Sequence, residues 1–365
     1  MMIVSCGMLV RINLKKRENK MQRTKDSLSD QVKKRAKTPV KKVSDYDGNT
    51  EVMISTGSTL LDLAISGGRV HGGGLPGGIL VEIFGPAGSG KTVLLCEIGG
   101  GIQRAGGDIM FHDPEARLNK QFATMFDMDI DKIEYTTPDT IPEVFNGVRK
   151  WQPESSSING VLADSLAALS TNLEMDNDDG DKMGMRRAKE FSEELRKTAR
   201  ILVQRNLLLV CSNQIRETMN SVGPKYKSPG GEAIGFYSSL RLRTALIKKI
   251  KIIKSIAGKD VERIVGITIN IEVSKSSIWK PHRTAPVTIM FDYGIDDVRE
   301  NLAFLKRYTK ANTYVCGGNK LDVSLAKSVR MIEESDSEKE LHEEVISLWE
   351  EIENKFTEPR KKKVR

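Results

Sequence analysis

The stretch from Ile79 to Leu95 constrains the fold of this chain more than any other. Residues 79–84 (ILVEIF) are mostly apolar and include β-branched members, which predicts a strand. Residues 85–92 (GPAGSGKT) then fit the pattern G-x-x-x-x-G-K-(S/T) without a mismatch. Apolar residues compatible with a helix follow from Val93 onwards. The pattern therefore has the strand before it and the helix after it that a phosphate-binding loop requires.

The residue types in this loop suit the binding of phosphate. Glycines at 85, 88 and 90 let successive backbone N–H groups point inward at phosphate oxygens, and the N-terminus of the following helix adds to that field. A glycine-rich turn with a chance Lys-Thr is the alternative, and the full match in this context argues against it. The sequence thus predicts a nucleoside triphosphate site with Mg²⁺, in which Lys91 meets the β- and γ-phosphates and Thr92 coordinates the metal. The residues assigned to nucleotide binding here are Gly85, Pro86, Ala87, Gly88, Ser89, Gly90, Lys91, Thr92 and Val93.

The charge of the chain is unevenly distributed. The net charge is +8, and residues 1–50 hold 13 Lys and Arg against 5 Asp and Glu, so the arm accounts for the whole excess. A second basic cluster, EPRKKKVR, ends the chain. Basic arms of this kind are usually flexible and often bind nucleic acid, although a merely solvated tail is a fair alternative. For the C-terminal cluster, DNA contact or solvation is favoured over a nuclear-import signal.

Cysteine usage and hydropathy indicate the compartment. Cys96 and Cys211 stand in apolar runs, which predicts buried thiols in a reducing environment. No apolar run approaches the length of a membrane span. We therefore expect a cytoplasmic protein with no membrane partner.

The order of apolar and helical patterns predicts the fold class. Runs typical of buried strands alternate with amphipathic helical segments, which favours an α/β fold: a mostly parallel central sheet flanked by helices, with antiparallel strands added at the C-terminal side. The predicted strands cover residues 79–84, 109–112, 133–138, 159–163, 207–214, 238–246, 264–273 and 285–293, and the main predicted helices cover 59–66, 140–151, 185–205, 297–308 and 333–353. Four regions follow: a basic, largely disordered arm (1–50), the ATPase core (51–310), a small C-terminal region with an acidic helix (311–356) and a basic tail (357–365).

Polar residues stand at the predicted ends of three further strands, where open α/β sheets bind ligands. Asp164 suits the second acidic site of P-loop ATPases, which holds Mg²⁺ through water; its alternative is an Asp that caps the next helix. Glu115 is placed to accept a proton from attacking water, and from spacing alone a surface ion pair is about as good a reading. Gln214 offers an amide to the γ-phosphate, although spacing alone favours an ordinary polar residue at a strand end.

From Ser55 to Tyr293, about two-thirds of its length, the chain resembles the RecA/RadA family of strand-exchange recombinases, as a divergent member. The phosphate loop alone would not be specific; the combination of segments is. The segments that carry the resemblance are ISTGSTLLDLAISGG, GGGLPGGILVEIFGPAGSGKT, FHDPEARLNKQF, VLADSLAAL, VCSNQIRE and SPGGEAIGFYSSLRLR.

The resemblance implies a RecA-type P-loop ATPase core and assigns roles to single residues. Glu115 corresponds to the glutamate that activates water, and Gln214 to the glutamine that links the γ-phosphate to DNA. Asn119, Phe122 and Tyr293 fall near the adenine of ATP. Lys275 and Lys280 lie where lysines of a neighbouring subunit reach across a filament interface to the nucleotide.

Two DNA-binding loops are implied as well. The first corresponds to residues 172–185, with Met183 near its end, but it reads EMDNDDGDK, and acids repel phosphates; Arg186 and Arg187 would then supply the contact. The second corresponds to residues 217–229. There an aromatic lies between two cations (Lys225, Tyr226, Lys227), which suits phosphates and a stacked base, with an ordinary surface loop as the alternative.

The sequence thus predicts a DNA-dependent ATPase that assembles as a filament on single-stranded DNA, and promotes pairing and strand exchange with a duplex. Two other readings stay open: a RecA-fold motor, either a helicase or a repair ATPase related to RadA, and a recombination mediator that hydrolyses little ATP. A small-molecule kinase is disfavoured because no lid-like arginine cluster is apparent.

Overall fold

The computed structural model describes residues 52–171, 183–217, 226–227, 232–309, 311–358 and 360–361. The predicted basic arm (1–50) and most of the predicted basic tail lie outside the described residues, so both stay predictions. All described residues belong to one compact unit, Thr50–Arg365.

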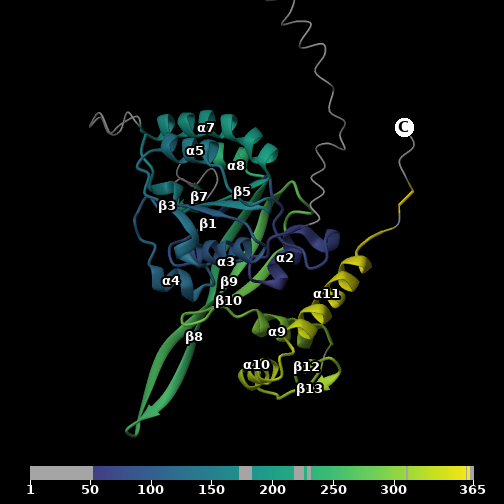
Figure 1. The fold of residues 1–365 in the computed structure, drawn as a ribbon. Coiled ribbons are helices and arrows are strands. Elements are labelled where there is room, and N and C mark those ends of the chain that lie inside the picture. Colours follow the sequence, from purple (N-terminus) through teal and green to yellow (C-terminus); the bar gives the residue numbers. More distant parts are fainter. Residues whose placement is uncertain are drawn as a thin grey trace, which may run out of the picture. The chain divides into compact units, whose positions relative to one another are not determined.

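A nine-stranded sheet forms the centre of this unit, in the order β11-β10-β9-β8-β1-β5-β4-β2-β3 (Figure 1). Strands β3, β2, β4, β5, β1 and β8 pair in parallel, and β9, β10 and β11 continue the sheet with antiparallel pairing. The predicted mostly parallel sheet with antiparallel strands at its C-terminal side is therefore confirmed. The bounds are β1 Leu80–Gly85, β2 Ile109–His112, β3 Ile133–Thr136, β4 Asn159–Ala163, β5 Leu207–Gln214, β8 Leu240–Ile256, β9 Lys259–Ser276, β10 Thr284–Met290 and β11 Gly294–Ile295.

Helices cover both faces of the sheet, which explains why the central strands are apolar on both sides. Every residue of β1 is buried. One apolar cluster joins one face of the sheet to α2 (Thr59–Ser66), α3 (Lys91–Arg104) and α4 (Lys120–Met125). A second cluster joins the other face to α5 (Ile141–Lys150), α7 (Met183–Arg205) and α8 (Glu232–Tyr237). Within the described residues, short 3₁₀ turns lie in the connections at 67–69, 130–132 and 166–168.

The helix starts follow local capping chemistry. Ser58 precedes α2 and caps it, since its hydroxyl accepts a hydrogen bond from the N–H of Leu61 at 3.4 Å. At the start of α5, the Glu143 carboxylate accepts a hydrogen bond from the Thr140 N–H at 3.4 Å, which is one half of a capping box. The P-loop helix α3 begins directly at Lys91.

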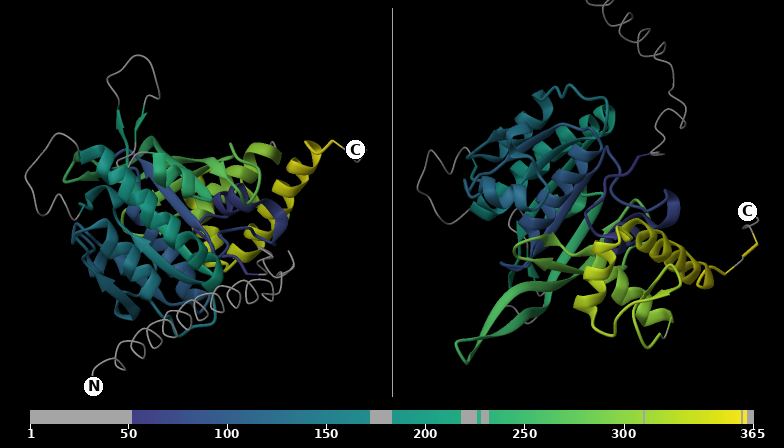
Figure 2. Two further views of the ribbon diagram at one scale, coloured as in Figure 1. Left: turned by 90° about the horizontal axis from the view of Figure 1, so that it is seen from above. Right: turned by 60° about the horizontal axis from the view of Figure 1, so that its bottom comes forward.

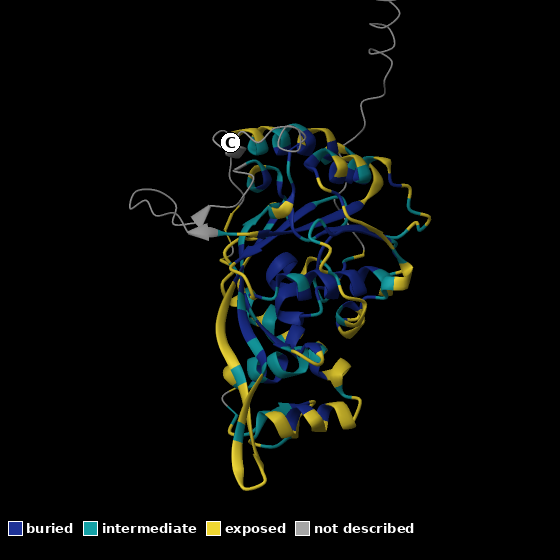
Figure 3. Cartoon of the chain, turned by 90° about the vertical axis from the view of Figure 1, so that its left-hand side faces the viewer, coloured by how far each residue is buried: buried dark blue, intermediate teal, exposed yellow. Residues whose placement is uncertain are grey.

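Strands β8 and β9 are much longer than predicted, with 17 and 18 residues, respectively. The sequence pattern ended the first strand at Leu246 and began the second at Ile264, whereas the two strands pair up to Ile256 and Lys259. Ala257 and Gly258, both with positive φ, form the two-residue turn between them. Residues 251–260 are all exposed, and the ribbon projects beyond the sheet (Figure 3). It has no buried face, so the period-2 alternation that marks half-buried strands is missing.

The C-terminal helices α9 (Asp297–Thr309), α10 (Leu325–Glu334) and α11 (Glu338–Lys355) lie together on the side of the core that carries α2 (Figure 2). Between α9 and α10 lies a small hairpin, β12 (Val315–Cys316) and β13 (Asn319–Lys320). The predicted acidic helix is confirmed but begins at Glu338, and its residues Leu341 and Val345 are buried. Trp349 on α11 contacts Trp279, with ring centroids 5.5 Å apart. The predicted domain boundary at residues 310 and 311 stays a prediction.

Cys96 and Cys211 are fully buried, as predicted from their apolar runs, and burial raises the pKa of both thiols. Among the helices that the structure describes, none has the length and apolar character needed to span a membrane.

Candidate active site

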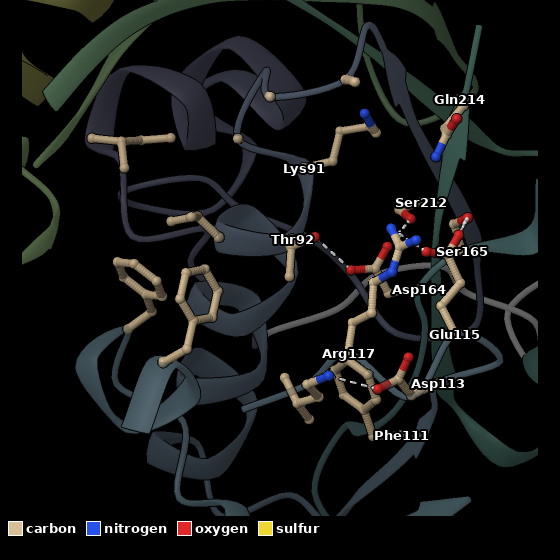
Figure 4. Close-up of a pocket in the computed structure, with 18 of the residues that line it drawn as sticks. Lys91, Thr92, Phe111, Asp113, Glu115, Arg117, Asp164, Ser165, Ser212 and Gln214 are labelled. Carbon is tan, nitrogen blue, oxygen red and sulfur yellow. Dashed lines mark hydrogen bonds and ion pairs between the residues drawn. The ribbon is translucent and has the colours of Figure 1, made fainter. Parts of the chain in front are cut away.

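The carboxyl ends of β1, β2, β4 and β5 meet at a cavity of about 450 Å³ (Figure 4). Its size lies within the usual range for small-molecule sites. It brings together Lys91, Thr92, Glu115, Asp164 and Gln214, which the sequence places at four separate strand ends. The other lining residues are Ala87, Gly88, Gly90, Val93, Phe111, Asp113, Arg117, Leu118, Phe122, Phe126, Ser165, Ser212, Ile267, Ile289 and Phe291.

The phosphate loop connects β1 to α3 in a conformation that needs glycine at two positions. Gly88 and Gly90 have φ of 69° and 77°, in the left-handed region. A Cβ on Gly90 would also lie 2.5 Å from Cδ1 of Ile289. Ser89 packs the loop against the sheet, since its hydroxyl donates to the Pro86 carbonyl at 2.7 Å and lies 2.7 Å from Oγ1 of Thr244.

Lys91 is held inside this loop. Its side chain is largely buried, and its Nζ donates to the carbonyls of Pro86 at 2.7 Å and Gly85 at 3.2 Å. Burial lowers the pKa of the ammonium, and the negative charge of Asp164 offsets part of that shift. Phosphate oxygens entering the loop would be stronger acceptors for this cation than the two neutral carbonyls.

Thr92 and Asp164, the predicted magnesium ligands, are in contact. The Thr92 hydroxyl donates to Oδ2 of Asp164 at 2.5 Å, and the Ser212 hydroxyl donates to the other carboxylate oxygen. Oxygen donors of this kind fit Mg²⁺, which usually takes few protein ligands and fills its shell with waters and phosphates. The described residues contain no group of three or more His, Cys, Asp or Glu side chains that could hold a metal by themselves.

The loop after β2 is fixed by Asp113, a residue to which the sequence pattern gave no role. Its carboxylate is buried and accepts hydrogen bonds from the Leu118 N–H at 2.7 Å and the Tyr135 hydroxyl at 2.9 Å. Its own N–H donates to the Thr136 carbonyl at 2.8 Å. These bonds hold both ends of residues 113–118, and Ala116 between them takes a φ of 50°.

This fixed loop presents Glu115 to the cavity. Its carboxylate pairs with Nη1 of Arg117 at 2.5 Å and lies 3.5 Å from the Ser165 hydroxyl (Figure 4). Arg117 is a second cavity residue that the sequence pattern did not single out. Its only local signal is a cation two positions after the candidate base.

Gln214 is the last residue of β5 and lies at the cavity. Directly after it, β6 (Arg216–Glu217) pairs with β7 (Tyr226–Lys227) in a two-stranded antiparallel ribbon. The described parts of the second predicted DNA loop, Glu217 and Tyr226–Lys227, therefore pair close to Gln214 in the sequence. Residues 218–225, among them Lys225, lie outside the described residues.

The residues predicted near adenine separate into two groups. Phe122 lines the cavity and packs edge-on against Phe126, with centroids 4.4 Å apart. Asn119 instead caps α4, where its side chain accepts from the N–H groups of Gln121 and Phe122, and it does not line the cavity. Tyr293 is 59% exposed and also lies outside the cavity lining, where Phe291 takes part.

The remaining predicted cations lie away from the cavity. Lys275 donates to the carbonyls of Gly235 and Phe236 at 2.9 and 2.8 Å. Lys280 pairs with Glu353 at 3.6 Å and lies over the Trp279 ring. Their predicted reach to a neighbouring subunit stays a prediction.

The predicted DNA contacts on α7 differ from one another. Arg186 is exposed, whereas Arg187 donates to the Ala167 carbonyl at 2.9 Å. Met183 begins α7, but its side chain lies outside the described residues, as do those of Tyr226 and Lys227.

The family model and the curated relatives both identify the family of this chain. The model of the RecA N-terminal domain matches residues 22–296, well over half of the chain. The RecA protein of Acholeplasma laidlawii is 31% identical over 281 residues, 76% of this chain and 80% of the relative. That of Acinetobacter baylyi is 31% identical over 327 residues, 87% of this chain and 88% of the relative. Among solved structures, the RadB recombinase matches with 19% identity and a TM-score of 0.48, over 67% of this chain and 98% of that one.

The chain therefore belongs to the RecA family. At the level of the family, this assigns it to ATP- and DNA-binding ATPases of DNA recombination and repair.

Proposed function

We propose that this chain is an ATP-dependent recombinase that assembles as a filament on single-stranded DNA, hydrolyses ATP when bound to DNA, and promotes homologous pairing and strand exchange with a duplex in the cytoplasm. The observation that carries the proposal is the position of Gln214. It lies at the cavity with Lys91 and Glu115 and is separated by one residue from the β6–β7 ribbon that frames the second predicted DNA loop. Family membership supports the same assignment.

The chemistry follows from the residues at the cavity. Lys91 would bind the β- and γ-phosphates, and Glu115 would orient the attacking water and accept its proton. Thr92 and Asp164 would hold Mg²⁺, which when bound neutralises charge on the phosphates. Phe122 and Phe126 would form an apolar wall for the base. The amide of Gln214 can hydrogen-bond to the γ-phosphate before hydrolysis and loses that partner afterwards, which would give the DNA loop two arrangements.

The assembly and the ATPase are tested together. We expect single-stranded DNA to stimulate ATP hydrolysis, and electron micrographs with a non-hydrolysable ATP analogue and DNA to show open helical filaments. Glu115→Gln should keep nucleotide binding and slow turnover by about 10²–10⁴-fold, the usual effect of a positioned base. Closed rings would instead favour a RecA-fold motor, such as a helicase. DNA binding with negligible turnover in the unmodified chain would favour the mediator reading.

A further inference from the structure

The cavity holds an ion pair between the candidate base and a cation on the same loop. Nη1 of Arg117 lies 2.5 Å from Oε2 of Glu115. The Glu115 side chain is 20% exposed and the Arg117 side chain is 78% exposed. Among the described residues that line the cavity, Lys91 and Arg117 are the two cations. Arg117 therefore stands where an anionic ligand would meet it, opposite a carboxylate that must be available to water during hydrolysis.

The loop geometry keeps Arg117 at the cavity that the phosphate loop also lines. The bonds that the Asp113 carboxylate accepts from Leu118 and Tyr135 fix the loop that carries both Glu115 and Arg117. Figure 4 shows both side chains at the cavity, close to Asp164. The backbone is thus held while the long, exposed side chain of Arg117 can change its partner.

Binding of a triphosphate would change the balance of this ion pair. The Arg117 end of this ion pair is largely exposed, so water screens the interaction, and holding this long side chain in place costs freedom. A guanidinium matches phosphate oxygens with two parallel hydrogen bonds, and these charge-assisted bonds are stronger than neutral ones. The γ-phosphate would therefore compete well with Glu115 for Arg117.

We propose that Arg117 moves from Glu115 to the γ-phosphate when a nucleoside triphosphate binds. This proposal depends on the proposed function in one respect, namely that the cavity binds a nucleoside triphosphate. The chain thereby supplies from its own loop a second cation for the transferred phosphoryl group, and the same movement releases the Glu115 carboxylate to orient water. The other candidates for such a cation, Lys275 and Lys280, do not line the cavity in this chain. Negative charge on the γ-phosphate oxygens is stabilised by such a cation as the transition state forms.

The experiment measures the affinities for ADP and for a non-hydrolysable ATP analogue by calorimetry, with Mg²⁺ and without DNA. Arg117→Ala should weaken the analogue by about 10–100-fold, the value of a hydrogen bond between charged groups, and leave ADP within about threefold. Arg117→Lys keeps the charge but lacks the paired donors of the guanidinium, so its loss of affinity for the analogue should be intermediate. Lys120→Ala is the matched control, because it removes an exposed cation paired with Asp131 on the adjacent helix and should change neither affinity. ATP turnover is measured in the same proteins, and Arg117→Ala should lower it by about 10³-fold.

A second comparison separates contact with phosphate from an effect on Glu115. In a Glu115→Gln background, Arg117→Ala should still weaken the analogue by the same factor. The proposal is overturned if the analogue-to-ADP ratio is unchanged in Arg117→Ala, if the effect disappears in the Glu115→Gln background, or if hydrolysis becomes faster, which would make Arg117 a brake on the base. If the unmodified chain binds neither nucleotide, the nucleotide site and the proposed function fail together.

Discussion

Removal of the Asp113 carboxylate should displace Glu115 and slow catalysis while the chain remains folded. In the variant Asp113→Ala, the Leu118 N–H and the Tyr135 hydroxyl both lose the acceptor that now lies at 2.7 and 2.9 Å. A hydrogen bond to a charged group contributes about 1.5–3 kcal/mol. Tyr135 is partly exposed, so water can replace most of its bond. We therefore expect a loss of about 2–4 kcal/mol in the free energy of unfolding.

The catalytic effect should be larger than this loss of stability suggests. The Asp113 bonds hold the loop that carries Glu115, and a displacement of a catalytic group by about 1 Å can lower the rate by about 10²-fold. Asp113→Ala should thus lower kcat by about that factor while ADP affinity stays near that of the unmodified chain, because the phosphate loop is untouched. Tyr135→Phe is the control: it removes the partly exposed bond alone, and should cost less than about 1.5 kcal/mol with kcat nearly unchanged.

The measurements are denaturant unfolding, steady-state ATP hydrolysis and ADP titration at a temperature where all three proteins are folded. The reasoning is refuted if Asp113→Ala hydrolyses ATP at the unmodified rate. It is equally refuted if Tyr135→Phe loses as much kcat as Asp113→Ala, because the bond to the Leu118 N–H would then not be the one that positions Glu115.

Three further predictions concern pH, coupling and DNA. Burial raises the pKa of Glu97 from 4.5 to about 7, so the folded chain holds a proton there that the unfolded chain releases, and stability is lost as pH rises between these values. Glu97→Gln keeps an acceptor for the Ile295 N–H. Between pH 4.5 and pH 8 its free energy of unfolding in urea should rise by up to about 3 kcal/mol relative to that of the unmodified chain. Parallel pH profiles of the two proteins would contradict this. Gln214→Ala should still bind ATP, but ATP should no longer tighten DNA binding, and DNA should no longer tighten ATP binding. If the ratio of DNA affinities with the ATP analogue and with ADP is the same as in the unmodified chain, Gln214 is not the switch. Arg186→Ala should flatten the salt dependence of single-stranded DNA binding by roughly 0.7 in the log–log slope. Arg187→Ala loses the hydrogen bond to the Ala167 carbonyl and should mainly lower the melting temperature. The reverse pattern would exchange the roles of the two arginines.

The parts of the site that the sequence predicted are those fixed by local pattern and by parallel pairing. The phosphate loop follows from consecutive residues, and Glu115, Asp164 and Gln214 each follow an apolar run. Parallel strands end at one edge of a sheet, so their side chains meet at the cavity although they are far apart in the sequence. The resemblance to RecA-family segments supplied the roles, which local spacing left open.

Other features depend on geometry that local patterns do not carry. The Asp113 bonds and the Arg117 ion pair arise from the fold of one short loop, in which Ala116 takes a positive φ that its residue type does not indicate. Asn119 shows the converse: it matches a family position, yet its side chain is used to cap α4. The β8–β9 ribbon was underestimated because it buries no face against the core, and only its cross-strand hydrogen bonds define it.

The most direct test of the proposed function is homologous pairing. The unmodified chain would be incubated with single-stranded DNA and a supercoiled duplex, and joint molecules would be counted with ATP, with ADP and with a heterologous duplex. We predict joint molecules only with ATP and homology, and none from Lys91→Ala, which lacks the cation for the β- and γ-phosphates. Joint molecules that form without ATP, or their absence while single-stranded DNA stimulates ATP hydrolysis, would contradict the assignment of this chain as a strand-exchange recombinase.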